Sequence, residues 1–353
     1  MSCAWVSALL AAPVLAQAPA AAPGTPPPLV GAACIPDSPK PAPFRAQPRA
    51  AEQRDLTIKA IPGVVAAGGR WTKVWQQGGN SADGLLPDRG DAVLVAQEDY
   101  DTVLRIGADG RASPAFTGLK GLGSLSQDRQ GRLYGAHRTE HAESIKPDRD
   151  AIVNAVTQIA PERRTIADRW EDGRPLTLRP NDILADGSGG VYVTGGCLYY
   201  AGPKGVGVIA DNLRTNGIAF SPDDKVLYVT NGRSLVAFDV AGPGRLTNRR
   251  DFGVLEAGGF GDGLAVDTEG RVYATSGPGV QVFDRAGKYL GLIPTPRGVI
   301  SIAFAGPGKG MLYVVGSGAD DENGRPIMEG PQHTAATLYR LPVLSHGLKD
   351  RAK

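Results

Sequence analysis

Four side chains with oxygen donors recur at one position of a repeated segment. Asp83 and Asp262 supply carboxylates at this position, and Asn181 and Asn216 supply amides. Each stands directly before a short apolar stretch, so repeats arranged around one axis would bring the four side chains together. Carboxylates and amides gathered in one cavity are costly to desolvate. A hard divalent cation removes that cost, because oxygen ligands suit Ca²⁺, Mg²⁺ and Mn²⁺.

We therefore expect one divalent cation as cofactor, with Ca²⁺ as the first choice and Mg²⁺, Mn²⁺ or Zn²⁺ as alternatives. No His or Cys shares the repeat position, which argues against a site built for zinc. The competing interpretation is turn chemistry, since Asn and Asp before a strand are common turn residues. Any one of the four residues alone fits that interpretation. Their occurrence at the same position of the repeat favours the metal.

The repeated segment joins two short apolar strands through a turn rich in Gly, Asp and Pro. Its copies start at residues 83, 123, 181, 216, 262 and 300. A strand pair of this kind cannot bury its apolar face alone, but sheets packed radially can. Short strands at such a period, with an aromatic residue in the second strand, are typical of propeller blades. The sequence predicts an all-β fold, a six-bladed β-propeller.

Outer strands complete several of the predicted blades. Residues 234–239 and 279–284 are expected third strands, 288–293 a fourth strand, and 337–341 the third strand of the last blade. The chain then ends before that blade is complete. The N-terminal strand Trp71–Trp75 is expected to close the last blade and the ring, which would remove the free sheet edges.

The chain divides into four predicted parts. Residues 1–16 resemble a secretory signal peptide, with an apolar core at 8–14, although no Lys or Arg precedes the core. Residues 17–54 are rich in Pro and Ala, which predicts a linker. Residues 55–345 hold one propeller domain, and 346–353 form a C-terminal tail. We therefore expect an exported protein, either periplasmic or secreted.

Charge and cysteine usage bound the partners. The chain has 38 basic and 36 acidic residues, and this balance gives no reason to expect nucleic acid or an anionic membrane as partner. No stretch outside the signal predicts a membrane span. The expected partner is a small-molecule substrate, and the sequence does not indicate an oligomeric state. After removal of the signal, Cys34 and Cys197 either pair in an oxidising compartment or stay as thiols.

Three of the copies carry a family resemblance. Arg179-Pro180-Asn181-Asp182, the segment Asn216–Asp223 and the segment Asp262–Asp267 resemble signatures of the gluconolactonase / senescence-marker (regucalcin-like) family, as does Asn248-Arg249-Arg250. The similarity extends from about residue 80 to 341. It implies a six-bladed propeller with one divalent metal in the central channel, which hydrolyses sugar lactones or related esters. Related propellers hydrolyse organophosphates.

The resemblance implies a role for each matching residue. Asn216 and Asp262 match metal ligands, Asn181 matches an asparagine that contacts the metal or its water, and Arg179 matches a substrate-binding arginine. The family has a glutamate before Gly-Pro in the first blade, where this chain has Asp83 before Gly84-Leu85. This departure keeps open a non-catalytic propeller that binds a ligand or partner with a structural metal, and a related phosphotriester or ester hydrolase.

The preferred function is a metal-dependent lactonase. The metal would polarise the lactone carbonyl and activate a water, with Asp262 as ligand and candidate general base and Asn181 beside the reacting group. Arg179 would hold a hydroxyl or carboxylate of the substrate, although a surface arginine on a loop explains it equally well. Asp182 either orients Asn181 or caps a turn.

Two further segments have competing interpretations. His137-Arg138-Thr139-Glu140-His141 spells a metalloprotease motif, but that chemistry needs both histidines on one helix face, and the segment directly follows a predicted strand. We interpret it as coincidence. The long interval between His141 and Trp170 predicts either a lid over one mouth of the channel or a long pair of outer strands.

Overall fold

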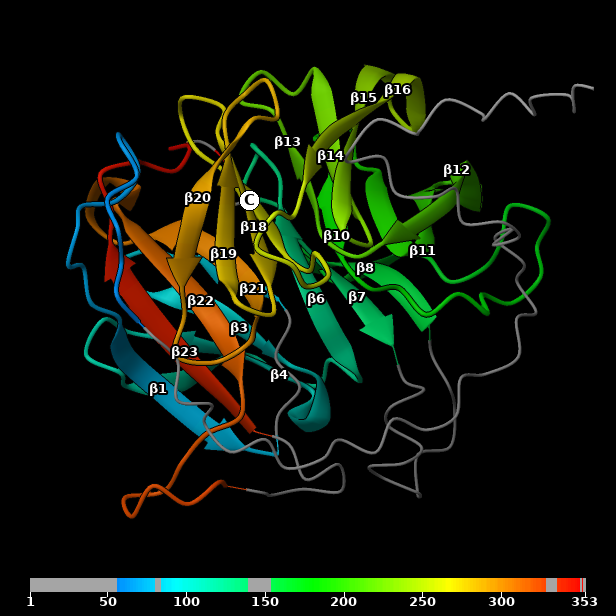
Figure 1. The fold of residues 1–353 in the computed structure, drawn as a ribbon. Helices are drawn as coiled ribbons and strands as arrows, with labels where there is room; N and C mark the ends of the chain where they lie inside the picture. The colour runs from blue at the N-terminus through cyan, green and yellow to red at the C-terminus, as the bar shows by residue number, and fades with distance from the viewer. Residues whose placement is uncertain (1–55, 80–83, 139–153, 328–334, 350, 352–353) are drawn as a thin grey trace, which may run out of the picture.

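The computed structural model describes residues 56–79, 84–138, 154–327, 335–349 and 351. Six antiparallel sheets are arranged in a ring (Figure 1), so the predicted six-bladed β-propeller is confirmed. The predicted signal peptide, the linker, Asp83, Glu140 and His141 lie outside the described residues. Within the described residues, no helix is long and apolar enough to cross a bilayer.

Blades 1 to 3 come first in the chain, and their strands follow in order from the channel outward. Blade 1 contains β2 (Leu85–Pro87), β3 (Val93–Gln97), β4 (Thr102–Ile106) and β5 (Ala112–Phe116), with the 3-10 turn η1 (Glu98–Tyr100) between β3 and β4. Blade 2 contains β6 (Leu122–Gln127), β7 (Leu133–Arg138), β8 (Asn154–Ala160) and β9 (Arg164–Ala167). Blade 3 contains β10 (Ile183–Ala185), β11 (Val191–Gly202) and β12 (Gly205–Thr215).

Blades 4 to 6 complete the ring. Blade 4 contains β13 (Ile218–Phe220), β14 (Val226–Asn231), β15 (Ser234–Gly242) and β16 (Arg245–Val254). Blade 5 contains β17 (Leu264–Val266), β18 (Val272–Ser276), β19 (Gly279–Phe283) and β20 (Tyr289–Pro294). Blade 6 contains β21 (Val299–Ala305), the 3-10 turn η2 (Pro307–Lys309), β22 (Met311–Ser317) and β23 (Ala335–Pro342), followed outward by β1 (Thr72–Gly78).

The ring is closed by the first strand of the described chain. β1 pairs antiparallel with β23, and the pairing extends from Thr72↔Arg340 to Gly78↔Ala335. Figure 1 shows the two strands side by side, blue against red. Trp71, just before β1, donates from Nε1 to the carbonyl oxygen of Pro294 in blade 5 at 2.8 Å. The predicted closure by residues 71–75 is therefore confirmed, with the strand shifted toward Gly78.

Blade 3 has three continuous strands in place of four because β11 turns back on itself. The Tyr200 hydroxyl donates to Asp186 at 2.6 Å, although Asp186 directly precedes the turn into the start of β11. A straight strand would carry Tyr200 roughly 30 Å away from Val191. Gly196 has a φ of +90°, which permits the reversal. β11 thus serves as both second and third strand of its blade.

Aromatic residues in the second strands bind neighbouring blades together. Tyr134, Tyr192, Tyr273 and Tyr313 are fully buried at equivalent positions. Tyr273 meets Phe304 of blade 6 edge to face at 5.0 Å, and Tyr192 meets Phe220 of blade 4 in the same way at 5.6 Å. Such contacts add about 0.5–1.5 kcal/mol beyond the buried area. The second-strand tyrosines of blades 3 and 5 therefore belong to blade interfaces.

One end of the ring is built from aspartate turns, and we call it the turn end. In blade 5, Asp267 accepts from the backbone N–H groups of Glu269 and Arg271, from Arg271 Nε at 2.7 Å and from the Tyr273 hydroxyl at 2.9 Å. In blade 2, Asp128 makes the same set of bonds with Gln130, Arg132 and Tyr134. The recurring sequence Asp-x-x-Gly-Arg-x-Tyr thus specifies a recurring turn.

The C-terminal segment crosses the turn end of the ring. Thr268 N donates to the carbonyl oxygen of His346 at 2.9 Å, and Gly347 N donates to that of Lys309 at 3.0 Å. Arg351 donates from Nη2 to the carbonyl oxygen of Ser221 at 2.7 Å and forms an ion pair with Asp224. The segment that we predicted as a tail after residue 345 therefore contacts blades 4, 5 and 6.

The remaining predictions about outer strands are also settled. The expected third strands correspond to β15, β19 and β23, and the expected fourth strand to β20. The interval after His141 contributes β8 and β9, the outer strands of blade 2, which is the strand-pair alternative for residues 154–167. His137 is buried in strand β7 and not on a helix, as the rejection of the metalloprotease motif requires.

Candidate active site

The residues before the inner strands gather at the end of the channel opposite the aspartate turns, which we call the ring end. Its described positions are Gly123, Asn181, Asn216, Asp262 and Ile300. The Asn216 and Asp262 segments touch, because a Cβ on Gly217 would lie 1.9 Å from the Asp262 carbonyl oxygen. Gly263 N donates to the carbonyl oxygen of Ile300 at 2.9 Å. The structure therefore brings Asn216 and Asp262 together as neighbours around the channel.

Three buried threonines at the ends of the second strands fix the backbone of the ring end. Thr194 donates to the carbonyl oxygen of Asn216 at 2.5 Å, and Thr230 accepts from Asn216 N at 3.0 Å. Thr275 donates to the carbonyl oxygen of Ile300 at 3.1 Å. All three are fully buried, so these hydrogen bonds fix the backbone at Asn216 and Ile300 in an environment without water.

Asp182 joins three blades instead of capping a turn. Its carboxylate accepts from Ser124 Oγ of blade 2 at 2.7 Å, from its own neighbour Ile183 N at 2.8 Å and from Ile218 N of blade 4 at 3.3 Å. The side chain is buried. Asp182 therefore positions the backbone on both sides of Asn181, which is a broader role than the predicted orientation of the Asn181 side chain.

A charged cluster that the sequence did not predict lies beside Asn181. Arg138, at the end of β7, donates from Nε to Glu98 Oε2 at 2.9 Å, and both side chains are almost fully buried. Arg138 Nη1 donates to the backbone oxygen of Asn181 at 3.2 Å and to its Oδ1 at 3.3 Å. Arg179 approaches the other oxygen of Glu98 at 3.8 Å. The cluster therefore joins blades 1, 2 and 3.

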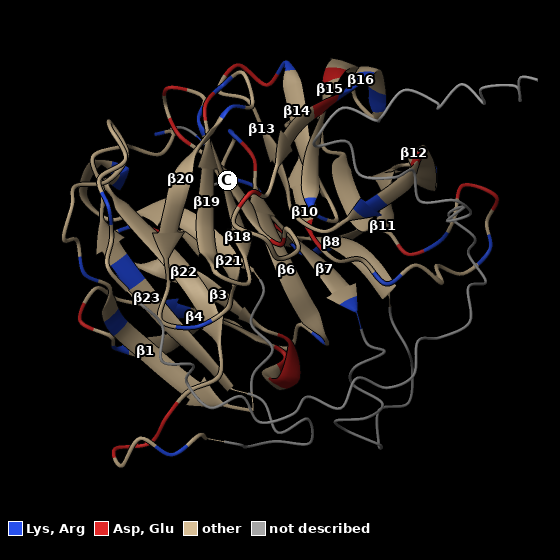
Figure 2. Cartoon of the chain, viewed as in Figure 1, with Lys and Arg blue, Asp and Glu red and all other residues tan. Residues whose placement is uncertain are grey.

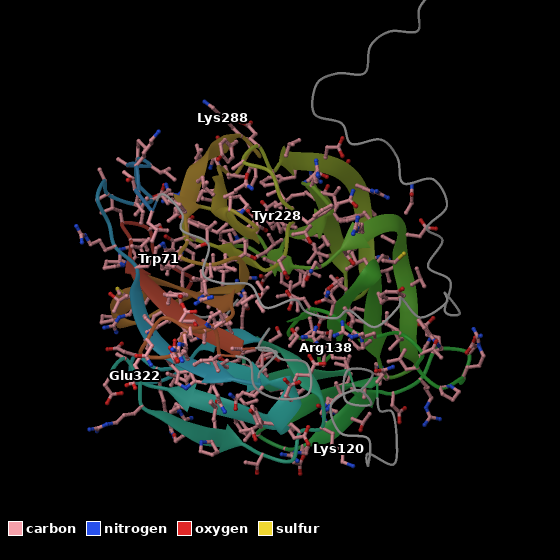
Figure 3. The ribbon with its side chains drawn as sticks, turned by 60° about the horizontal axis from the view of Figure 1, so that its bottom comes forward. Trp71, Lys120, Arg138, Tyr228, Lys288 and Glu322 are labelled. Carbon is pink, nitrogen blue, oxygen red and sulfur yellow. The ribbon has the colours of Figure 1, made fainter. Side chains whose placement is uncertain are left out.

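The position of Arg138 depends on Gly123. A Cβ on Gly123 would lie 1.9 Å from Arg138 Nε and 2.3 Å from its Cζ. The guanidinium thus fills the space where other blades carry a side chain at the ring end. Figure 3, in which the lower side of Figure 1 faces the viewer, shows Arg138 toward the middle of the ring. In Figure 2, η1 with Glu98 is the red turn on that side.

The Arg138 contact also determines how the Asn181 amide is oriented. A guanidinium can only donate hydrogen bonds, so the amide atom that faces Arg138 must be the carbonyl oxygen. The Asn181 NH₂ group is then directed away from Arg138. Asn181 is half-buried. Because its amide oxygen already faces Arg138, the side chain is better suited to donate a hydrogen bond from its NH₂ group than to bind a cation through its oxygen.

The chemistry of the ring-end donors fits a hard cation on the side of blades 4 and 5. Asn216 supplies an amide and Asp262 a carboxylate, both half-buried, and oxygen ligands of this kind suit Ca²⁺ or Mg²⁺. Asp83, the third predicted ligand, lies outside the described residues. Across the part of the chain that the structure describes, no group of three or more His, Cys, Asp or Glu side chains is arranged to hold a metal.

The sequence could have revealed the cluster through one signal. Segments 123–138 and 262–277 align without a gap, so Gly123 corresponds to Asp262 and Arg138 to Gly277. A small residue at the ring end paired with a long cation at the end of the second strand predicts that the cation occupies the vacated space. Glu98 has no such signal, because η1 is an addition to blade 1.

The fold and the ring end define the class of protein. The family model described as SMP-30/Gluconolactonase/LRE-like region matches residues 115–318, more than half of the chain. The chain belongs to this family, and the predicted resemblance is confirmed.

A pentonolactonase and a lactonohydrolase share part of the sequence. Pentonolactonase XacC of Haloferax volcanii is 30% identical over 202 residues, which cover 51% of this chain and 68% of that protein. Lactonohydrolase oryH of Aspergillus oryzae is 34% identical over 143 residues, or 32% of this chain. This chain spans only 30% of the length of the oryH protein.

Solved structures share the fold. A gluconolactonase from Xanthomonas campestris, XC5397, superposes with a TM-score of 0.63 at 21% identity, covering 85% of this chain and 98% of that one. The calcium-binding protein regucalcin from Agrobacterium tumefaciens superposes with a TM-score of 0.56 at 19% identity, covering 77% and 95%. At such identities the likeness supports the propeller fold alone.

Proposed function

We propose that this protein hydrolyses sugar lactones and uses one divalent cation, with Ca²⁺ as the first choice, at the ring end. The observation that carries the proposal is the close backbone approach of the Asn216-Gly217 segment to Asp262, at the end of the channel that also holds Asn181 and Arg179. The names of the sequence relatives, a pentonolactonase and a lactonohydrolase, support the substrate class.

The proposed cation site uses Asn216 and Asp262 as ligands, with Asp83 as the third. When bound, the cation would supply Lewis-acid chemistry, polarising the lactone carbonyl and stabilising the negative charge that develops on its oxygen. Asn181 would then act on the substrate, because its amide oxygen accepts from Arg138 and its NH₂ group can donate to a substrate oxygen. This assignment refines the predicted ligand role of Asn181.

Asp262 is the proposed general base. Its carboxylate would accept a proton from the water that attacks the carbonyl carbon, and the ring C–O bond would then break. The proton would be delivered to the departing ring oxygen, so that a hydroxy acid leaves as product. A base that also binds a cation is weakened, and the reaction therefore needs the carbonyl to be strongly polarised.

Arg179 is the proposed substrate-binding residue. Its side chain is 30% exposed and shares Glu98 with the nearly buried Arg138. Glu98 would hold the Arg179 guanidinium in place, and the exposed part of the guanidinium would donate to a hydroxyl or carboxylate of the substrate. A hydrogen bond from Arg179 to a part of the substrate away from the carbonyl would orient the lactone for attack.

The test is hydrolysis of a panel of aldonolactones by the purified protein, followed by proton release. It compares added Ca²⁺, other divalent ions, chelator and the Asp262→Ala variant. Turnover is expected with the ion and should fall by at least about 10³-fold in the variant, the scale of removing a main transition-state contact. Asp239→Ala, which removes an exposed acid of an outer strand paired with Arg250, is the matched control and should keep full turnover.

Other outcomes separate the alternatives. Ion binding that Asp262→Ala abolishes, without turnover of any lactone, would reject the lactonase and leave a binding propeller with a structural metal. Turnover confined to phosphotriesters or simple esters would assign a related hydrolase. If chelator and ion addition change nothing while Asp262→Ala is inactive, the cation is rejected and the base is retained.

We also propose that the protein is exported to the periplasm or secreted. Cys197 takes part in a disulfide, and disulfides persist in oxidising compartments. The sequence has two other cysteines, Cys3 and Cys34, both outside the described residues, and Cys34 is the proposed partner because Cys3 lies within the predicted signal. Mass spectrometry of the protein recovered from its compartment would test both points, since it reports the N-terminus and the linked peptides.

A further inference from the structure

An exposed aromatic ring with two arginines stands next to the ring end. Phe260 lies in the loop between β16 and β17 and is 50% exposed. The Arg214 guanidinium carbon lies 4.7 Å from the centre of the Phe260 ring, and that of Arg233 lies 5.3 Å from it. We call these three residues the Arg-Phe-Arg patch. The two guanidinium carbons are thus at most about 10 Å apart, which is about one Debye length at roughly 0.1 M ionic strength.

The patch is held by backbone hydrogen bonds between three segments. Gly232 N donates to the carbonyl oxygen of Arg214 at 3.0 Å, Gly261 N donates to that of Gly232 at 2.8 Å, and Leu255 N donates to that of Arg233 at 3.0 Å. Gly261 is packed so closely that a Cβ there would lie 2.8 Å from Thr230. The three side chains therefore project from a fixed frame and not from a free loop.

The charge of the patch is not balanced by neighbouring acids. Both arginine side chains are exposed, and neither forms an ion pair with any acid in the described chain, although many other arginines of the molecule do. Two like charges beside one ring repel each other. A pair of guanidiniums on an aromatic face is an arrangement that an anion would stabilise, through charge-assisted and bidentate hydrogen bonds.

The patch also lies within reach of the proposed reaction. Phe260 precedes Asp262 by two residues, and Arg214 precedes Asn216 by two. Two residues of extended chain span about 7 Å. A lactone whose carbonyl lies at Asn216 and Asp262 could therefore place a substituent on the patch. The face of Phe260 would pack on the C–H face of the sugar, since aromatic rings present a large apolar surface.

We propose that the Arg-Phe-Arg patch is a subsite for the anionic end of the substrate, and that the natural substrate is an acidic sugar lactone that carries a carboxylate or a phosphate. This inference rests on the proposed lactonase function and narrows its substrate class. Arg214 and Arg233 bind the anion, and Phe260 aligns the sugar between the anion and the ring end.

The test compares three lactones of one sugar: the neutral aldonolactone, the lactone of the corresponding aldaric acid, and the aldonolactone phosphorylated at its terminal hydroxyl. The protein is expected to show a higher kcat/KM for one or both anionic lactones. The double variant Arg214→Gln/Arg233→Gln should lower the ratio of anionic to neutral kcat/KM by about tenfold or more, as expected for losing about 1.4 kcal/mol. The carboxylate and phosphate arms show which anion is recognised.

Two controls sharpen the result. Arg285→Gln removes an exposed arginine at the turn end of blade 5, where its Cβ lies beside Gly270, and it should leave all three rates unchanged. Phe260→Ala should raise KM for the anionic lactones while the two arginines remain. Added salt should reduce the anionic preference of the unmodified protein more than that of the double variant.

Equal kcat/KM for neutral and anionic lactones in the unmodified protein would overturn the subsite, as would a double variant that lowers all three rates equally. If no lactone is hydrolysed, the proposed function has failed, and calorimetric titration with the aldarate dianion and the sugar phosphate decides the subsite separately. Binding of either anion that the double variant loses would support the patch, whereas equal binding by both proteins, or none, would reject it.

Discussion

In blade 5 the ring end holds the carboxylate of Asp262, whereas in blade 2 the same position holds Gly123 and the guanidinium of Arg138. The two blades are otherwise the same at the turn end, where Asp267, Arg271 and Tyr273 repeat the bonds of Asp128, Arg132 and Tyr134. Blade 5 thus places a half-buried carboxylate at this position, and blade 2 places a buried guanidinium paired with Glu98.

The difference shows how a propeller changes its chemistry without changing its frame. The aspartate turns fix blades 2 and 5 at the end away from Gly123 and Asp262, so these two positions can differ with little effect on the strands. Where blade 5 has Asp262, blade 2 has Gly123, and where blade 5 has Gly277, blade 2 has Arg138. This pair of exchanges replaces a negative side chain with a positive one at the same place in the blade. The guanidinium then organises Glu98, Arg179 and the amide of Asn181 in blades 1 to 3, whereas Asn216 and Asp262 lie in blades 4 and 5.

Among variants that test the difference between blades 2 and 5, removal of the Arg138 guanidinium should have the largest effect. Arg138→Met leaves Glu98 buried with only part of its charge compensated, which should cost about 3–5 kcal/mol of unfolding free energy. It should also lower kcat/KM for a lactone, because Asn181 loses the donor that orients its amide. Urea denaturation measures the first effect, and steady-state kinetics the second.

A second variant separates stability from positioning. Glu98→Gln added to Arg138→Met removes the buried charge and should recover most of the unfolding free energy. If it also restored kcat fully, Arg138 would be a structural residue only. Recovery of stability with a persistent loss in kcat would assign Arg138 as the positioning residue of Asn181.

The next effect concerns the space that blade 2 leaves open at the ring end. Gly123→Ala places a methyl group where the Arg138 guanidinium lies, and overpacking of this kind costs about 1–3 kcal/mol. The control is Gly277→Ala in blade 5, at the position that corresponds to Arg138, where a Cβ would meet nothing within 4 Å. It should change stability by less than about 0.5 kcal/mol. Equal thermal denaturation of the two variants would contradict the assigned role of Gly123.

At the turn end, replacement of an aspartate should lower the unfolding free energy more where its arginine partner is more deeply buried. The Asp267 side chain is fully buried and its partner Arg271 is 11% exposed, whereas the partner of Asp128, Arg132, is 26% exposed. Asp267→Asn should therefore cost about 2–4 kcal/mol of unfolding free energy, and Asp128→Asn about half as much. Chemical denaturation of both variants checks the order, and a larger loss at Asp128 would refute it.

The smallest predicted effect is on acid stability. Burial lowers the pKa of His137 in blade 2 below its usual value of 6.5, so the unfolded chain takes up a proton first as the pH falls. Stability from this residue is therefore complete above about pH 6.5 and declines below it, by at most about 1.4 kcal/mol per pH unit. His137→Gln should show a shallower decline between pH 7 and pH 5 in urea titrations. Parallel declines would contradict the assignment.

Most of the frame could be predicted from the sequence because the blades repeat. Each copy carries a similar strand pair joined by a turn, and five of the six have an aromatic residue in the second strand. The six sheets and the shared repeat position of Asn181, Asn216 and Asp262 therefore follow from alignment alone. Ring closure by residues 71–75 also follows, since an incomplete last blade leaves an unpaired edge. The reversal within β11 was not predicted, because it depends on one glycine inside an apparently continuous strand.

The pairing of Arg138 with Glu98 could not be predicted, because the repeat does not relate these two residues. Glu98 and Arg138 are 40 positions apart, in different blades and at different places within the blade. Only the packing of blades 1, 2 and 3 brings them together. The bonds of Asp182 to Ser124 and Ile218 are equally non-local, and they explain why its predicted role was too narrow.

The pairing of β1 with β23 has a consequence for biosynthesis. The strand that completes the ring is made first and its partner almost last, so β1 must wait for nearly the whole chain to leave the ribosome. Until then the growing ring keeps a free edge, and contacts between such distant segments slow folding. The last blade must therefore be made before the ring can close, and pairing of β1 with β23 is expected late in folding.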